Sequence, residues 1–283
     1  MLRRPFTEQP VSRLAVWARR VAFFSLVATV LAIIIVRSGL LEIRPAIGTL
    51  AGALSLAVIA LLLAFAAFAV IWKDGLGGMG SALSAIAISI GLLGYPAYLG
   101  IKAYKLPWIY DITTDPIDPP RYEALARIRP RDANPVIYAG LSAAEQQRAA
   151  YPDIESVDEE ASPKGAYEAA LAVMTKRKWT VLLKRAPEPR RDGHIEAVAR
   201  TPIMGFRDDV VVRIRAIPDG SRIDARSSSR YGTFDFGSNA QRLRRLLDDV
   251  DDAIGDQKPE RPAAPPAKKQ KTPPKGNQPS ARR

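Results

Sequence analysis

Three long apolar runs, separated by short polar turns, fill the first third of the chain. They lie at residues 21–41, 46–72 and 81–101, and the stretch 21–36 has only Ser25 and Thr29 as polar side chains. About 20 apolar residues suffice to cross the ~30 Å hydrocarbon layer of a bilayer. The pattern therefore predicts a three-helix membrane anchor over residues 21–104, after a short basic leader over residues 1–20.

No Asp, Glu, Lys, Arg or His lies within residues 21–36, 46–72 or 81–101. Transporters and proton pumps usually place charged groups there, so an anchor is the favoured interpretation. Gly48 and Gly52 have the G-x-x-x-G spacing that lets helices approach closely. We expect them to pack inside the bundle, with dimerisation as the open alternative. Pro96, near the end of the third run, predicts a kink.

Basic residues suggest how the chain is oriented in the membrane. The leader contains Arg3, Arg4, Arg13, Arg19 and Arg20, and no A-x-A-like cleavage site follows the first run. Fewer basic residues lie in the first loop and after the third run. Since cytoplasmic segments are enriched in Lys and Arg, we expect a multi-pass protein of the inner (cytoplasmic) membrane, with a cytoplasmic N-terminus and a periplasmic soluble domain.

The pattern changes to short alternating runs over residues 105–255. Helices are expected at 142–150, with Ser142 and Glu145 as a capping box, at 164–178 after the cap Ser162, and from Ser238 or Asn239 to 254. Strands are expected at 179–185, 194–201, 209–217 and 221–230. This order predicts an α+β domain, in which an antiparallel four-stranded sheet carries helices on one face.

Charge is distributed unevenly along the chain. The net charge is +12, yet residues 106–255 contain 23 basic and 24 acidic residues. The excess lies in the leader and in the Pro- and Lys-rich segment 256–283, which we expect to be a disordered tail. A nucleic-acid-binding protein normally carries its positive surface on the folded domain, so nucleic acid is not an expected partner. The chain has no cysteine, which excludes disulfides and thiolate chemistry.

The predicted hairpin 209–230 concentrates polar residues that could form a site. We select Arg213, Arg226, Arg230, Asp209, Asp224 and Asn239. One interpretation is structural, with Arg213 and Arg226 facing Asp209 and Asp224 as cross-strand charge pairs. The other is a ligand pocket in which the three guanidinium groups bind a small anionic or lipidic ligand.

Catalytic chemistry has little support in the sequence. His194 is the only histidine, and at the start of a strand we expect it to be exposed. A triad of Ser227, His194 and Asp208 is conceivable, but no nucleophile-elbow motif accompanies it. One histidine is too few for the usual metal clusters. We therefore predict no catalytic residue, no metal and no cofactor.

Four segments of the soluble part resemble a known family. They are IYDITTDPIDPP (109–120), AYPDI (150–154), IEAVARTPIMGFRDDVVVRI (195–214) and DARSSSRYGTFDFGSNAQR (224–242). Their order resembles the domain of unknown function 1499 family, which includes membrane-anchored bacterial members. The resemblance implies domain limits near 105 and 255, and it implies no activity.

Together these observations predict an integral membrane protein with a non-catalytic domain that binds a ligand or an envelope protein partner. Two alternatives stay open. One is a carrier of lipid or of a small hydrophobic anion, and the other is an unrecognised envelope hydrolase.

Overall fold

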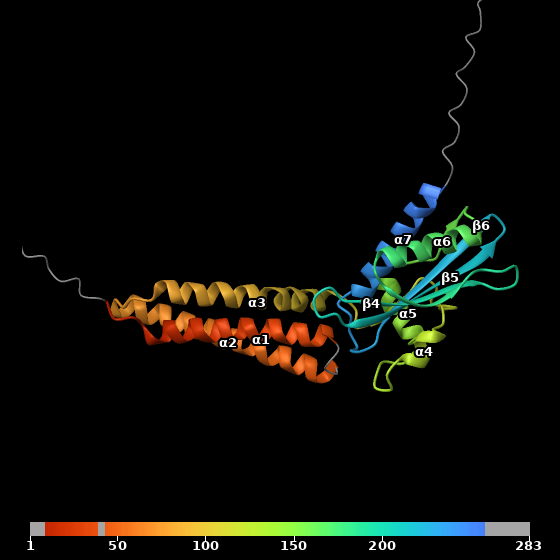
Figure 1. Cartoon of the computed structure of the whole chain (residues 1–283). Coiled ribbons are helices and arrows are strands. Elements are labelled where there is room, and N and C mark those ends of the chain that lie inside the picture. Colours follow the sequence, from red (N-terminus) through yellow and green to blue (C-terminus); the bar gives the residue numbers. More distant parts are fainter. Residues whose placement is uncertain (1–8, 39–42, 258–283) are drawn as a thin grey trace, which may run out of the picture.

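The computed structural model describes residues 9–38 and 43–257 and has two parts, a bundle of three helices and an α+β domain (Figure 1). The first eight residues of the predicted leader, and the predicted tail apart from residues 256 and 257, lie outside the described residues. The fold agrees with the sequence prediction in its order: apolar helices first, then an antiparallel sheet with helices.

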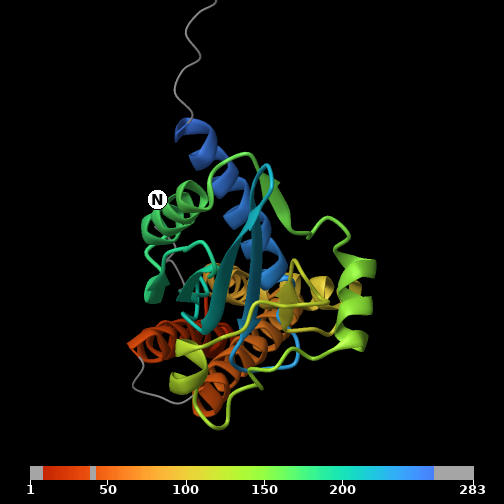
Figure 2. The ribbon, with the colours of Figure 1, turned by 90° about the vertical axis from the view of Figure 1, so that its right-hand side faces the viewer.

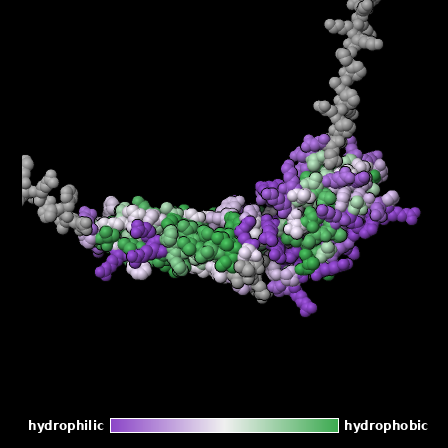
Figure 3. Space-filling view, in the orientation of Figure 1, coloured by the Kyte–Doolittle hydropathy of each residue, from purple (hydrophilic) through white to green (hydrophobic). Residues whose placement is uncertain are grey.

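The bundle consists of α1 (Arg13–Ser38), α2 (Ile43–Asp74) and α3 (Met79–Lys105). All three are long and apolar enough to cross a membrane, and the space-filling view shows the apolar surface along them (Figure 3). Each contains most or all of a predicted span. α1 begins at Arg13, so part of the predicted leader is helical. Pro96 lies inside α3, which continues to Lys105.

Small side chains hold the bundle together. Buried alanines recur along all three helices, among them Ala18, Ala22, Ala60, Ala64 and Ala85. The Ser25 hydroxyl donates a hydrogen bond to the Ala53 carbonyl of the neighbouring helix at 2.7 Å. Gly48 and Gly52 instead lie on the exposed face of α2, where a Cβ would meet no atom within 4 Å. The expectation that this glycine pair packs inside the bundle is therefore wrong, because alanines occupy the inner face.

The domain is built on one antiparallel sheet of order β1-β6-β5-β4-β3. Its predicted strands are β3 (Thr180–Arg185), β4 (Gly193–Arg200), β5 (Arg207–Ile217) and β6 (Gly220–Ser229). Two short strands that the sequence pattern did not reveal, β1 (Asp111–Thr113) and β2 (Val157–Glu159), pair with different stretches of β6. The sheet therefore has six strands rather than four. Three-residue strands are too short to show alternation.

The hairpin between β5 and β6 turns where Pro218, Asp219 and Gly220 predict it. Gly220 has φ 150°, and a Cβ there would approach the Glu159 carbonyl oxygen to 1.9 Å. Only glycine fits beside β2 without moving the backbone. The turn therefore fixes both the hairpin register and the place of β2.

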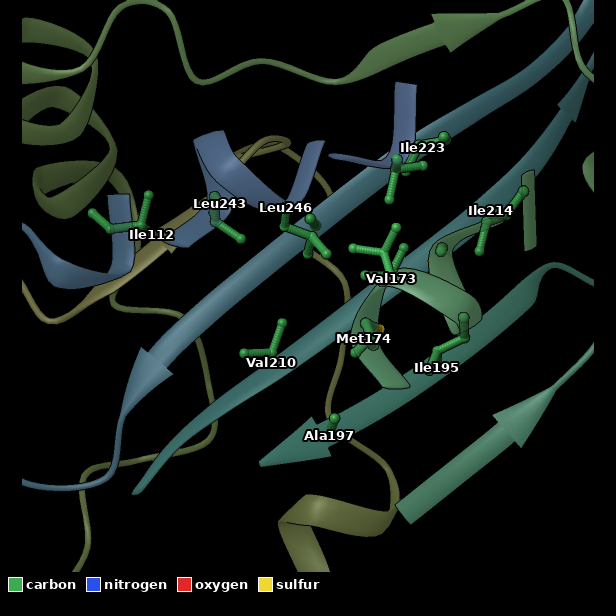
Figure 4. Close-up of a cluster of buried hydrophobic side chains, with 14 of the residues drawn as sticks. Ile112, Val173, Met174, Ile195, Ala197, Val210, Ile214, Ile223, Leu243 and Leu246 are labelled. Carbon is green, nitrogen blue, oxygen red and sulfur yellow. The ribbon is translucent and has the colours of Figure 1, made fainter. Parts of the chain in front are cut away.

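Two helices cover one face of the sheet: α6 (Pro163–Lys176) and α7 (Ser238–Gln257). In Figure 2 the strands lie in front of α7, which crosses behind them. Ser162 caps α6 as predicted, accepting a hydrogen bond from the Gly165 N–H at 3.2 Å. The core lies between this face and the two helices (Figure 4) and includes Val173, Met174, Ile195, Val210, Val212, Ile214, Ile223, Leu243 and Leu246.

The opposite face is covered by residues 114–140, which run from β1 to α5 (Leu141–Ala150) and include α4 (Ala124–Ile128). Leu125 of α4 packs with Val198 and Val211 of the sheet. The prediction that helices lie on only one face thus misses α4. α5 begins one residue before the predicted position, with Gly140 (φ 81°) as its N-cap, and Ser142 makes no cap.

Candidate functional site

The selected polar residues divide between the two faces of the sheet. Side chains alternate along a strand, and the odd-numbered residues Asp209 and Arg213 of β5 meet the even-numbered Asp224 and Arg226 of β6. These four, with Arg230 just after β6, lie on the face covered by residues 114–140. Asn239 belongs to α7 and lies on the other face. Sequence reasoning therefore grouped residues that form two separate clusters.

Among the residues that the structure describes, Arg226 is the largest fully buried side chain, with 2% of its surface exposed. Its Nε and Nη2 atoms donate to both carboxylate oxygens of Asp111 at 2.9 and 2.6 Å. Further hydrogen bonds go to the carbonyls of Pro120 and Val136 at 3.1 and 2.9 Å. The cross-strand pairing predicted for Arg226 is therefore wrong: its partner is Asp111 in β1, the neighbouring strand on the other side of β6.

Two tyrosines enclose the Arg226 guanidinium. Its Cζ lies 4.6 Å from the ring centre of Tyr122 and 5.6 Å from that of Tyr138. Burial raises the pKa of Tyr138 to about 12 and that of Tyr122 well above its ordinary value. Burial also raises the pKa of Asp111, against the hydrogen bonds from Arg226. Both tyrosine side chains are therefore neutral near pH 7. Because the two rings lie beside the Arg226 guanidinium, they leave little room for an external anion to reach it.

Asp209 is fully buried and links two arginines. One oxygen accepts from Arg230 Nε and the other from Arg129 Nε, both at 2.8 Å. Its backbone carbonyl also accepts from the Tyr122 hydroxyl at 3.1 Å. Arg129 had no local signal in the sequence, since it lies in an irregular segment 80 residues before its partner.

Asp224 and Arg213 form the cross-strand pair that the sequence predicted. They are register partners, and Arg213 Nε donates to Asp224 at 2.9 Å. Asp224 is completely buried, whereas Arg213 reaches the rim and also contacts Asp115 and Asp118. In this part of the site the structural interpretation is confirmed.

Asn239 belongs to the second cluster, beneath the start of α7. Its amide nitrogen donates to the Ser229 hydroxyl and to the Tyr110 carbonyl, both at 2.9 Å, and its oxygen accepts from the Ser227 hydroxyl at 2.8 Å. Arg242 binds Asp208 on the same face. The α7 N-terminus is capped by Asp235, which accepts from the N–H groups of Gly237 and Asn239. The Asn239 side chain therefore holds the helix to the sheet rather than capping it.

His194 is buried, with 5% of its surface exposed, so the expectation of an exposed position is wrong. Its Nε2 lies 2.9 Å from Oε1 of Glu196. Glu196 is fully buried and also accepts from the N–H groups of Glu123, Ala124 and Leu125 at 2.6, 3.3 and 2.7 Å. A strand residue thus caps α4 from outside the helix. The alternation in 194–196 places both residues on one face, but only the tertiary fold brings α4 there.

This geometry rules out the Ser227–His194–Asp208 triad. Ser227 and Asp208 lie on the face covered by α7, whereas His194 lies on the opposite face with Glu196. Along the sheet, His194 pairs with Arg213 while Asp208 pairs with Ala199. Five residues of strand separate the two positions, or about 16 Å. Within the described residues, no group of three His, Asp or Glu side chains could hold a metal ion.

Glu196 gives the domain a predictable acid sensitivity. Burial raises the pKa of Glu196, but the hydrogen bonds from His194, Leu125 and Glu123 outweigh burial and place the pKa below the ordinary 4.5. A depressed pKa means that the stabilisation is complete above about pH 4.5 and is lost as the pH falls through the folded-state value. We therefore expect the urea concentration at the unfolding midpoint of the full-length protein, measured by pulse proteolysis, to decrease as the pH is lowered below about 4.5.

The variant Glu196→Gln tests this assignment. It should have a lower midpoint at pH 7 and a flatter dependence on pH below 5, because the titrating group is gone. Glu145→Gln, on the exposed side of α5, is the matched control and should follow the wild type. An unchanged acid dependence in Glu196→Gln would remove Glu196 as the cause.

Comparison with known proteins agrees with the resemblance noted in the sequence. Residues 111–250 match the family model described as protein of unknown function (DUF1499). No curated protein matches the chain. The matched segment extends from β1 into α7 and includes both polar clusters. The part of this chain that follows the three apolar helices therefore resembles the DUF1499 family over residues 111–250.

Proposed function

We propose that this chain is a membrane-anchored, non-catalytic binding protein whose α+β domain recognises a protein partner in the cell envelope. The supporting observation is where the polar and apolar groups lie. The arginines that could hold a small anion are bound to carboxylates of the domain itself. By contrast, large aliphatic side chains are exposed on the segment that covers this face and at the start of α5: Ile117, Ile128, Ile137 and Leu141.

A contiguous exposed apolar patch marks an interaction surface, and we infer that these four side chains contribute to one. Ile137 is 78% exposed and Leu141 83% exposed. Arg121, Arg127 and Arg131 are exposed on the same segment. A partner with apolar and acidic side chains would complement this surface, which we call the 117–141 surface.

The proposal includes an orientation. Arg13, Arg19 and Arg20 of α1 lie at the same end of the bundle as Lys73 of α2, and the α+β domain follows the other end. The positive-inside rule favours a cytoplasmic position for the first end. The domain would then be periplasmic, anchored in the inner membrane.

Two other functions have weaker support. A carrier of lipid or of a small hydrophobic anion needs space between sheet and helices, and that interior is filled by fully buried side chains such as Met174, Ile214 and Leu246. A hydrolase needs a nucleophile beside a base, and His194 lies on the face opposite Ser227. Within the described part of the α+β domain, neither alternative has an observation in its favour.

One experiment tests both partner and orientation, because the chain contains no cysteine. Ile137→Cys in the full-length protein would be treated in spheroplasts with a membrane-impermeant maleimide that carries a photo-crosslinker. We expect labelling from outside and, after illumination, a discrete adduct heavier than the protein itself.

Lys164→Cys and Gln9→Cys are the controls. Lys164 is exposed at the start of α6, away from the 117–141 surface, so it should label without forming the adduct. Gln9, before α1, should label only after lysis. Labelling of Gln9→Cys in intact spheroplasts would refute the orientation, and equal adducts from positions 137 and 164 would refute the partner surface.

A further inference from the structure

A groove of about 580 Å³ runs along the surface of the helix bundle. Seven side chains from α1 and α3 line it: Arg19, Arg20, Phe23, Phe24, Val27, Ser84 and Ile88. The lining surface is almost entirely apolar, so Arg19 and Arg20 line the groove mainly with the methylene part of their side chains. The proposed partner surface does not include it, because it lies in the membrane-spanning part of the chain.

The groove has a direction. On α1 its residues follow helical spacing, so Arg20, Phe24 and Val27 lie on one stripe that extends about 10 Å along the helix. Ser84 and Ile88 of α3 are four residues apart and form the facing wall. Both arginines are at one end, next to the charge-free run 21–36, and the apolar side chains continue into that run.

This position matches the two parts of a phospholipid. The run 21–36 spans about 24 Å of helix, somewhat less than the ~30 Å hydrocarbon layer. We therefore infer that Arg19 and Arg20 lie close to the membrane interface, where long basic side chains extend to headgroup depth. Trp17 lies there too, and the Arg20 Cζ is 5.5 Å from the centre of its ring. Tryptophan is enriched at this depth, and the contact orients the Arg20 guanidinium.

We propose that this groove binds one phospholipid with an anionic headgroup. Arg19 and Arg20 bind the phosphate and its net negative charge, since guanidinium groups pair well with phosphate. One acyl chain lies against Phe23, Phe24, Val27 and Ile88. Ser84 leaves room for that chain because its side chain is small and donates to the Ser81 carbonyl of its own helix at 2.9 Å. No acidic side chain lines the groove, so an anionic lipid is favoured over a zwitterionic one.

Native mass spectrometry of the full-length, delipidated protein tests the proposal. The protein would be titrated with dioleoyl phosphatidylglycerol and, separately, with dioleoyl phosphatidylcholine. We expect the first phosphatidylglycerol to bind at least roughly tenfold more tightly than phosphatidylcholine. Arg19→Gln/Arg20→Gln should weaken that first binding roughly 30-fold, because each basic side chain near an anionic lipid contributes about a factor of five.

Two further variants keep the outcome decisive. Arg13→Gln/Lys73→Gln removes the same charge at the same end of the bundle but outside the groove, and it should leave the first binding unchanged. Val27→Trp, which fills the groove, should weaken binding of both lipids while the melting temperature is retained. Equal binding of the two lipids, or equal losses in the two charge variants, would overturn the proposal, as would undiminished binding in Val27→Trp.

Discussion

Asp209→Asn is expected to produce the largest loss of stability in the domain. The Asp209 carboxylate is fully buried and is the shared partner of Arg129 and Arg230, whose side chains are 3% and 4% exposed. Asparagine removes the negative charge. Its side-chain NH2 group would also replace one accepting oxygen, so that it faces the N–H groups of an arginine, which are donors as well. Two buried cations are then left without a counter-charge, and breaking a buried pair costs about 3–5 kcal/mol for one such cation. We expect a loss at or above this range.

A loss of that size is a large part of the 5–15 kcal/mol that stabilises a typical domain. Pulse proteolysis of the full-length protein across a urea series measures it, because cleavage reports the unfolded population of the domain. Asp158→Asn is the matched control. Asp158 and Arg222 form an exposed pair on β2 and β6, so the midpoint should be unchanged. A midpoint for Asp209→Asn within error of that control would contradict the buried network.

Arg226→Met is expected to destabilise the domain by about 3–5 kcal/mol. Methionine fills much of the volume between Tyr122 and Tyr138 but leaves Asp111 buried without its two hydrogen bonds. The carbonyls of Pro120 and Val136 also lose their donor. The loss therefore combines an unpaired charge with orphaned acceptors, and the same assay would measure it.

The pH dependence separates this cause from simple loss of packing. Burial already raises the pKa of Asp111, and removal of Arg226 raises it further. A raised carboxyl pKa penalises the folded state above that pKa, and the penalty is relieved as the pH falls below it. We therefore expect Arg226→Met to lose less stability at pH 5 than at pH 8. The double variant Asp111→Leu/Arg226→Met should be more stable than Arg226→Met at pH 8; a double variant that is less stable would contradict a charge-based cause.

Much of the architecture follows from local signals. The run 21–36 predicts a spanning helix because it contains no charged side chain and is almost entirely apolar. Ser162 and Pro163 mark the start of α6, and Pro218-Asp219-Gly220 marks the β5–β6 hairpin. These signals involve residues that are close in sequence, and their physical basis is helix capping, proline geometry and the conformational freedom of glycine. These local signals were enough to predict the order of the helices and strands and the α+β class of the domain.

The site was only partly predictable, for a reason visible in two of its residues. Asp224 and Arg213 face each other across a tight hairpin, so alternation alone pairs them. Arg226 has the same alternation, yet its partner Asp111 is 115 positions away in a strand of three residues. Alternation gives the face on which a side chain lies but does not say which distant segment will cover that face.

The sequence by itself determined the three apolar helices, the hairpin and the polar character of the strands, because each depends on neighbours within a few residues. Only the tertiary structure decided that His194 is buried, that Glu196 caps α4, and that Arg129 and Asp111 complete the charge network. These contacts form when residues 114–140 cover the sheet. Burial then requires every charge to find a partner, and the partners come from whichever segment lies within about 3 Å rather than from the nearest positions in the chain.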